Sequence, residues 1–241
     1  MPVPTVRTLD ALRSAAARRL LIAASMATAA CASAPAPAPG HEPAPTPTPP
    51  AANAPRDAVR PLAEFASRPL ALIPVQALGA RDTIGFAAQI GNVGAFLSSI
   101  DDEIAFALAQ RRTARQWQMP AVLARRMKNN GPYGIDVYDM GAGPLGDPRL
   151  KNDVPLPDPL ASNLRSLVAL GGEARYAIIP VELTFAGSRT AARALLKIAL
   201  VDARSSQLVW IGIIASEPVS RVSPAIPASL GASFADLVAA P

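Results

Sequence analysis

A proline-rich segment near the amino terminus decides which part of this chain can form a folded domain. Residues 32–56 contain nine prolines, together with alanine, threonine and a single glycine. Because proline has no backbone N–H to donate, such a segment favours extended polyproline geometry over a helix or a sheet. We therefore predict a disordered linker at residues 31–56 and a single domain at residues 57–241, long enough to bury about 70% of its unfolded surface.

The residues before the linker are typical of a cleaved export signal. Arg18 and Arg19 precede an apolar run of 11 residues, at positions 20–30, and small residues lead into Cys31, the only cysteine of the chain. The run is too short to cross a bilayer, which needs roughly 20 apolar residues. A charged region, a short apolar region and a small-residue exit predict a signal peptide at residues 1–30.

This arrangement resembles the signal of bacterial lipoproteins, in which the cysteine is lipidated and becomes the first residue of the mature chain. The resemblance implies a palmitate-bearing Cys31 and a membrane anchor. Ala32 after the cysteine, in place of Asp, resembles lipoproteins sent to the outer membrane, so we expect an extracytoplasmic chain facing the periplasm. Thr28 stands where the usual motif has Leu, which leaves plain secretion, export through a twin-arginine signal and an uncleaved anchor as alternatives.

The charge distribution gives no indication of a nucleic-acid partner. The formal net charge of the chain is +5, and residues 1–30 hold four arginines against Asp10, a net of +3, which leaves +2 for the remainder. Nucleic-acid-binding proteins concentrate lysine and arginine on one face. We therefore expect no nucleic-acid binding by the mature chain.

The pattern of apolar residues in the domain predicts an α+β fold. Three strands near the carboxyl terminus are joined by short connections, which are typical of an antiparallel meander. The expected architecture is a mixed, largely antiparallel sheet with helices packed on one side, in the order β-α-α-α-β-β-β-α. The strands are expected at 70–78, 176–185, 191–201 and 207–216, with a short one at 133–140. The first helix is expected to begin at Ser98-Ser99 and to be closed by Arg111, Arg112 and Arg115. The other helices are expected at 120–127, from Asp158-Pro159 to Gly171-Gly172, and at 227–239.

Two of these strands are alike in sequence. Residues 71–78 and 177–184 share Ala, Ile, Pro and Val at four of eight positions. A diverged repeat and a coincidence of strand-type composition both account for the match. Pro74 and Pro180 each remove a hydrogen-bond donor, so we expect both at an edge, an end or a bulge of the sheet.

The residue inventory leaves little catalytic chemistry open. His41, the only histidine, lies in the predicted linker, and the domain has no cysteine. A Ser-His-Asp triad, thiolate chemistry and a conventional zinc site are therefore excluded for the domain. We expect no catalytic residue, no metal and no cofactor, although catalysis by a Ser/Lys pair or by paired carboxylates stays open.

Six cations on two consecutive predicted helices form a candidate binding patch. A solvated helix surface is the simpler interpretation, and a docking patch for an acidic partner or an anionic envelope polymer is the functional one. The six residues are Arg111, Arg112, Arg115, Arg125, Arg126 and Lys128.

The later strands carry a family resemblance. Residues 176–181, the turn Asp202-Ala203-Arg204-Ser205-Ser206 and the following Leu208-Val209-Trp210 look like envelope lipoproteins whose domain is similar to the amino-terminal domain of TolB. The periplasmic part of the curli secretion channel and lipoprotein activators of penicillin-binding proteins look related. The chain departs from that group in residues 113–157, which are longer and richer in proline, and in a turn without the usual glycine.

The resemblance implies a non-enzymatic, anchored domain that binds an envelope protein in a secretion, transport or cell-wall complex. The group has no shared active site, so no functional residue carries over. Two alternatives stay open: a secreted or periplasmic carboxylate-dependent hydrolase, and an oligomeric structural subunit in which copies pair through the edge of the sheet.

Overall fold

The computed structural model describes residues 60–172 and 174–239. The predicted signal peptide, Cys31 and the proline-rich linker lie outside these residues, so those predictions are not tested by the structure. No helix in the described part combines the length and the apolar character that a membrane span requires.

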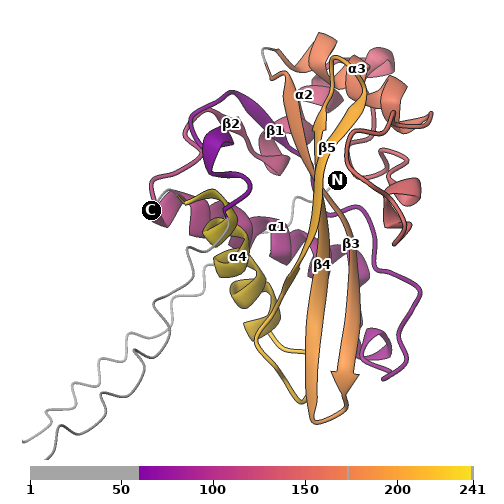
Figure 1. The fold of residues 1–241 in the computed structure, drawn as a ribbon, viewed down its shortest axis with the longest axis vertical. Coiled ribbons are helices and arrows are strands. Elements are labelled where there is room, and N and C mark those ends of the chain that lie inside the picture. Colours follow the sequence, from indigo (N-terminus) through magenta and orange to yellow (C-terminus); the bar gives the residue numbers. More distant parts are fainter. Residues whose placement is uncertain (1–59, 173, 240–241) are drawn as a thin grey trace, which may run out of the picture. The chain divides into compact units, whose positions relative to one another are not determined.

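The centre of the domain is a five-stranded mixed sheet in the order β2-β1-β3-β4-β5 (Figure 1). The short strand β1 pairs in parallel with both β2 and β3. The pairs β3–β4 and β4–β5 are antiparallel, as the short connections predicted. The strands are β1 (Leu70–Leu72), β2 (Trp117–Gln118), β3 (Tyr176–Ser188), β4 (Ala191–Asp202) and β5 (Gln207–Ala215).

Four α-helices accompany the sheet and confirm the predicted α+β class and element order, to which the structure adds β2. They are α1 (Val93–Gln110), α2 (Pro120–Asn129), α3 (Leu160–Gly171) and α4 (Ala225–Val238). Short 3₁₀ turns occur at Ala63–Phe65, Ala87–Gln89, Gly131–Tyr133 and Gly143–Gly146.

The helices lie on both faces of the sheet, whereas one side was expected. Buried residues of α1 and α4 pack with Leu70 and Leu72 of β1, and buried residues of α2 and α3 pack with Ala71 and Ile73. Successive side chains of a strand point to opposite faces. A strand that is apolar at every position is therefore covered twice, which explains the continuous apolar run here.

The helix α1 begins earlier than its sequence indicated. The side-chain oxygen of Asn92 accepts a hydrogen bond from the Ala95 backbone N–H at 2.9 Å, which caps the helix six residues before Ser98, where the predicted cap begins. Ser99 instead lies within the helix, where its hydroxyl donates to the Phe96 carbonyl one turn back. The acidic residues that follow, from Asp101 onwards, consequently occupy the middle of the helix rather than its first turn.

The strand expected at residues 133–140 does not form. A 3₁₀ turn occupies its start, and the Asp136 carboxylate accepts a hydrogen bond from the Tyr138 N–H, two residues on. Such a side-chain bond to the local backbone holds a turn in place of a strand. The prediction of a strand from these residues was wrong.

The two similar segments lie side by side in the sheet. Ala71 pairs with Ala177 and Leu72 with Ile178, so the matching residues of β1 and β3 are brought into register. The register of β3 against β4 then shifts between Pro180 and Glu182. Because Pro180 has no N–H to donate, a bulge is the position that a proline tolerates within a sheet, as its sequence predicted.

Candidate functional site

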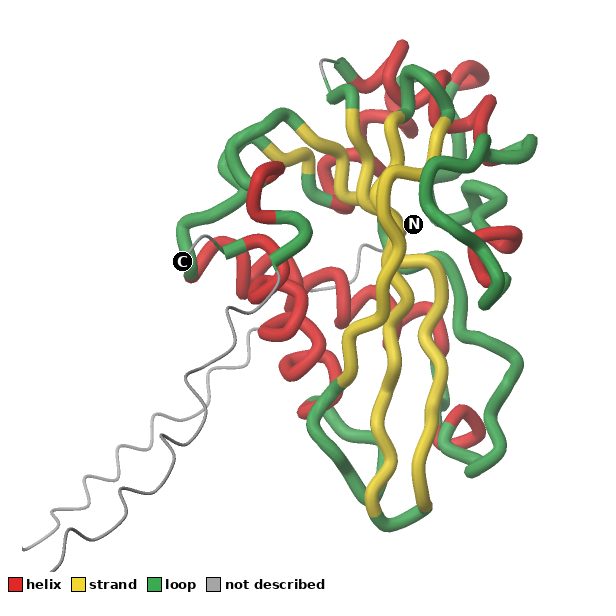
Figure 2. The backbone as a smooth tube through the Cα atoms, in the orientation of Figure 1, coloured by secondary structure: helices red, strands yellow, loops and turns green. Residues whose placement is uncertain are grey.

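Among the described residues, no helix covers half of one face of the sheet. In β4 every residue from Ile198 to Asp202 is buried, whereas the preceding residues alternate between buried and accessible. Figure 2 shows the long β3–β4 hairpin running beyond α2 and α3, which gather near its other end. We call the uncovered surface of β3, β4 and β5 on this side the open face.

A groove of about 850 Å³ lies on the open face. Its floor is a row across three strands, in which Glu182 pairs with Lys197 and Lys197 with Ile213. The next row pairs Thr184 with Leu195. Residues 80–83 and 143–150 contribute the walls. The site is therefore built on rigid strands, with irregular segments only at its rim.

The charged groups of the groove are close to one another. The Lys197 ammonium donates to the Asp147 backbone carbonyl at 2.9 Å. Burial lowers the pKa of Lys197, and the neighbouring carboxylates of Glu182 and Asp147 act in the opposite direction. A β-carbon placed on Gly146 would lie 3.5 Å from a Glu182 carboxylate oxygen, so the wall and the floor meet at this acid. The floor thus presents one cation and one anion among apolar side chains.

The outer border of the groove is β5, the last strand on this side of the sheet in the described part of the chain. Its side chains Ile211 and Ile213 face the groove, and Ile213 is 62% exposed. On the opposite face, a β-carbon on Gly212 would lie 2.3 Å from the Trp210 ring, so that indole covers the glycine. This edge is apolar on both faces.

The turn at residues 202–206, which carries the family resemblance, is held together by the side chain of Asp202. The Asp202 carboxylate accepts hydrogen bonds from the backbone N–H groups of Arg204 and Ser205 and from the Arg175 guanidinium, at 2.6 to 3.2 Å. Burial alone would raise the pKa of Asp202, but these bonds together lower it. Ser206 adopts a left-handed φ of 53°, a conformation that glycine takes without strain.

A buried carboxyl group lies away from the groove. Asp101 of α1 is 8% exposed, and its carboxylate accepts a hydrogen bond from the Val75 N–H at 2.9 Å. Burial raises the pKa of Asp101 to about 7; the Val75 bond opposes this change, and the nearby Asp102 adds to it. This group lies at the contact between α1 and the segment after β1, so its charge bears on stability.

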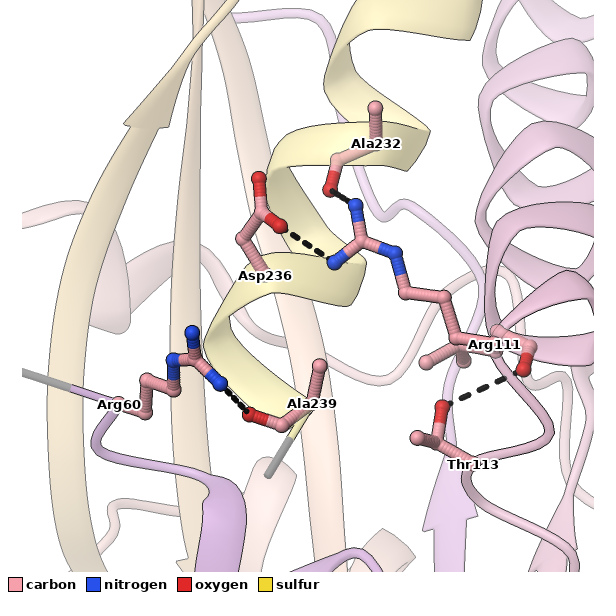
Figure 3. A network of polar contacts seen from close by, with 7 residues as sticks. Arg60, Arg111, Thr113, Ala232, Asp236 and Ala239 are labelled. Carbon is pink, nitrogen blue, oxygen red and sulfur yellow. Dashed lines mark hydrogen bonds and ion pairs between the residues drawn. The ribbon is translucent and has the colours of Figure 1, made fainter. Parts of the chain in front are cut away.

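The six predicted patch residues are divided among several surroundings. Arg111 bonds to Asp236 and to the Ala232 carbonyl of α4, and Figure 3 shows it reaching toward that helix. Arg126 donates to the Gly171 carbonyl, at the end of α3. Arg126 thus places positive charge at the carboxyl end of α3, where it is favoured, and Arg111 forms an ion pair with Asp236 of α4. Both arginines therefore have structural partners.

The other four patch cations, Arg112, Arg115, Arg125 and Lys128, are exposed. Arg125 and Lys128 line a second hollow, of about 660 Å³, together with Tyr138. Whether the six residues bind a partner stays a prediction.

Within residues 60–172 and 174–239, no group of three or more metal-ligating side chains is close enough to hold an ion. The groove itself was not predicted from the sequence. The sequence offered one signal. In the strand at 191–201, Arg193 and Lys197 share a face with Leu195, Ala199 and Val201, and such a mixed face indicates partial cover.

The sequence matches no protein-family model and no curated protein sequence. Among solved structures, the chain is similar to the PelC dodecamer from Paraburkholderia phytofirmans, with 11% identity, a TM-score of 0.33, and coverage of 71% of this chain and 88% of that one. The chain is also similar to the carboxyl-terminal domain of LpoB from Salmonella enterica, with 14% identity, a TM-score of 0.34, and coverage of 66% of this chain and 95% of that one. For lipoprotein GNA1162 from Neisseria meningitidis the identity is 15% and the TM-score 0.31, with coverage of 64% of this chain and 83% of that one. Likenesses of this size carry no inference about function, and the resemblance to the TolB and curli group stays a prediction.

Proposed function

We propose that this chain is a lipid-anchored protein of the bacterial envelope that binds a partner protein through the groove of the open face and catalyses no reaction. The anchor is supported by the sequence around Cys31, where an apolar run too short to span a membrane ends in small residues. The proline-rich linker would act as a spacer of up to roughly 75 Å between membrane and domain. Ala32 after the cysteine supports an outer-membrane location facing the periplasm.

The groove is the observation that carries the binding role. It is open to solvent and its floor is a rigid sheet. Lys197 and Glu182 lie among apolar side chains in the floor, and Arg81 and Asp147 lie in the walls. An extended segment of an envelope protein suits it, with apolar side chains over Leu195 and Ile211 and charged ones opposite Lys197 and Glu182. Burial of apolar surface supplies the affinity, and the two charges select the partner.

The same residues favour binding over hydrolysis. A carboxylate-dependent hydrolase needs two carboxyl groups facing one substrate, one of them with a raised pKa. Burial does raise the pKa of one described carboxyl group, that of Asp101, but this residue lies outside the groove. In the groove, the Asp147 carboxylate accepts a hydrogen bond from the Arg149 N–H at 2.8 Å and so holds its own loop.

The anchor is tested by the intact mass of the mature protein purified from membranes, beside a Cys31→Ser variant. We expect a chain that begins at Cys31 and carries acyl groups, and a variant from which they are lost. An unmodified chain in the soluble fraction would contradict the anchor and leave a secreted domain.

The groove is tested by chemical cross-linking in the envelope followed by affinity purification of the tagged chain. Leu195→Lys places a second cation in the floor and is expected to remove the captured partner. Phe106→Lys, at a side chain of α1 that is 59% exposed, is the matched control and should retain it. Equal capture by both variants would show that the groove is not the binding site.

A further inference from the structure

The outer edge of β5 forms hydrogen bonds with other segments of the domain at both of its ends. At the first end, the Asp153 N–H donates to the Leu208 carbonyl at 2.8 Å, and the Leu208 N–H donates to the Val154 carbonyl at 2.9 Å. At the other end, the Ser233 hydroxyl donates to the Ala215 carbonyl at 3.3 Å. These contacts leave an open stretch of edge between the two ends.

The direction of the backbone groups in that stretch follows from the ladder with β4. The Ser216 N–H donates to the Ala194 carbonyl, and hydrogen-bonded and non-hydrogen-bonded pairs alternate along an antiparallel pair. Ile211 and Ile213 therefore direct their N–H and C=O groups away from β4. No group among the described residues bonds to them. Two residues with two groups each give four open backbone sites.

This stretch lacks the usual protection of an edge strand. Natural edges carry lysine, proline or a strong bulge that discourages pairing. Residues 208–215 contain no charged residue and no proline, and the bulge in the β4–β5 ladder lies at the covered end, between Leu200 and Val201. Ile213, at the centre of the stretch, is 62% exposed. Such an edge is a site for adding a further strand.

We propose that β5 pairs with β5 of a second copy of this chain, antiparallel, about a two-fold axis through Gly212. Ile211 then lies opposite Ile213 of the partner subunit, and by symmetry Ile213 lies opposite Ile211 of the partner subunit. Both are hydrogen-bonded pairs, so all the open N–H and C=O groups at Ile211 and Ile213 are satisfied in each copy. The result is one continuous sheet through both copies, with an isologous interface.

The charges and shapes along β5 favour a second copy over an unrelated strand. Pairing about Gly212 also brings Trp210 opposite Ile214 of the partner subunit and Val209 opposite Ala215 of the partner subunit, so no two charges face each other. Gly212 meets its own counterpart on the axis, where the missing side chain allows close approach. The chain's own proline-rich residues 32–56 cannot supply a regular ladder of N–H donors.

The first test is the mass of the purified full chain in solution, measured by sedimentation. We expect a dimer for the wild type, at least tenfold weaker association for Ile213→Lys, and unchanged association for Phe106→Lys. Because Ile213 is largely exposed, the lysine variant should fold. A wild type that stays monomeric, or a dimer that Ile213→Lys leaves intact, would overturn the proposal.

The second test reads the register and does not depend on the lysine variant. In a Cys31→Ser background, chains with Ile211→Cys are mixed with chains carrying Ile213→Cys and then oxidised. The mixture should cross-link, and each variant alone should cross-link far less. Cross-linking that is equal in all three samples would rule out the axis at Gly212. Partner capture through Leu195 is scored separately, so self-pairing and groove binding can fail independently.

Discussion

The two halves of the β4 strand have different surroundings. From Ile198 to Asp202 it passes between α1 and α4 on one side and α2 and α3 on the other, and every residue is buried. From Ala191 to Lys197 only the first of these layers continues, and burial alternates. The period of burial in a strand therefore reports how many of its faces are covered, residue by residue.

The difference in cover between the two halves of β4 has a functional consequence. The doubly covered half supplies stability, because each face of the sheet packs against two helices. The half with an open face keeps only one layer, and its other side chains are available to a partner. In this account the same strand provides the rigid frame at one end and the floor of the binding groove at the other.

A matched pair of charge insertions on one strand face should give the largest effect. Ala199 is fully buried and Leu195 lines the groove, four residues away on the same side. Ala199→Lys buries an unpaired charge and should lower the free energy of unfolding by roughly 3–5 kcal/mol. Leu195→Lys should lower it by about 1 kcal/mol or less. Urea unfolding measures both, and similar losses would break the distinction between the halves.

The buried Asp101 should make the covered side sensitive to pH. Burial raises its folded-state pKa from the ordinary value of 3.8 to about 7. The favourable contribution of Asp101 to stability is therefore present below pH 4 and is lost as the pH rises through 7. Asp101→Asn stays neutral and keeps an oxygen for the Val75 N–H. At pH 8 we expect the variant to be more stable by roughly 2–4 kcal/mol.

The difference between Asp101→Asn and the wild type should shrink as the pH falls toward 4. Thermal unfolding across this range measures it. A constant difference at every pH would show that the charge of Asp101 is not the cause.

A smaller effect is expected at Gly212, which pairs with Ile198 at the boundary between the two halves. Its closed side is tightly packed, since a β-carbon there would meet the Trp210 ring at 2.3 Å. Gly212→Ala should displace the indole and cost about 1–2 kcal/mol. Thermal unfolding and tryptophan fluorescence would report it. An unchanged spectrum and stability would mean that both faces of this edge are loosely packed.

The strands of the meander could be predicted because their signals are local. Alternating apolar residues and short turns located β3, β4 and β5 to within a few residues. The strand β2 has two residues, too few to show a period. The start of α1 depends on Asn92, whereas Ser98 and Ser99 offered an equally good capping signal within the helix.

The second helical layer and the groove could not be located in the same way. Which face α2 and α3 cover depends on contacts between residues far apart in the chain. The groove depends on residues 143–150 lying beside β3 and β4, and these residues have no periodic pattern. The mixed face of β4, with Arg193 and Lys197 among apolar residues, indicated only that something partly covers it.

The most direct test of the central claim is photo-cross-linking in the living envelope, with a photoreactive residue at Leu195 or at Phe106 on α1. The account predicts partner adducts from position 195 and few or none from position 106. Adducts from position 106 alone would contradict it, because the chain would then bind through its helical layer and not through the open face.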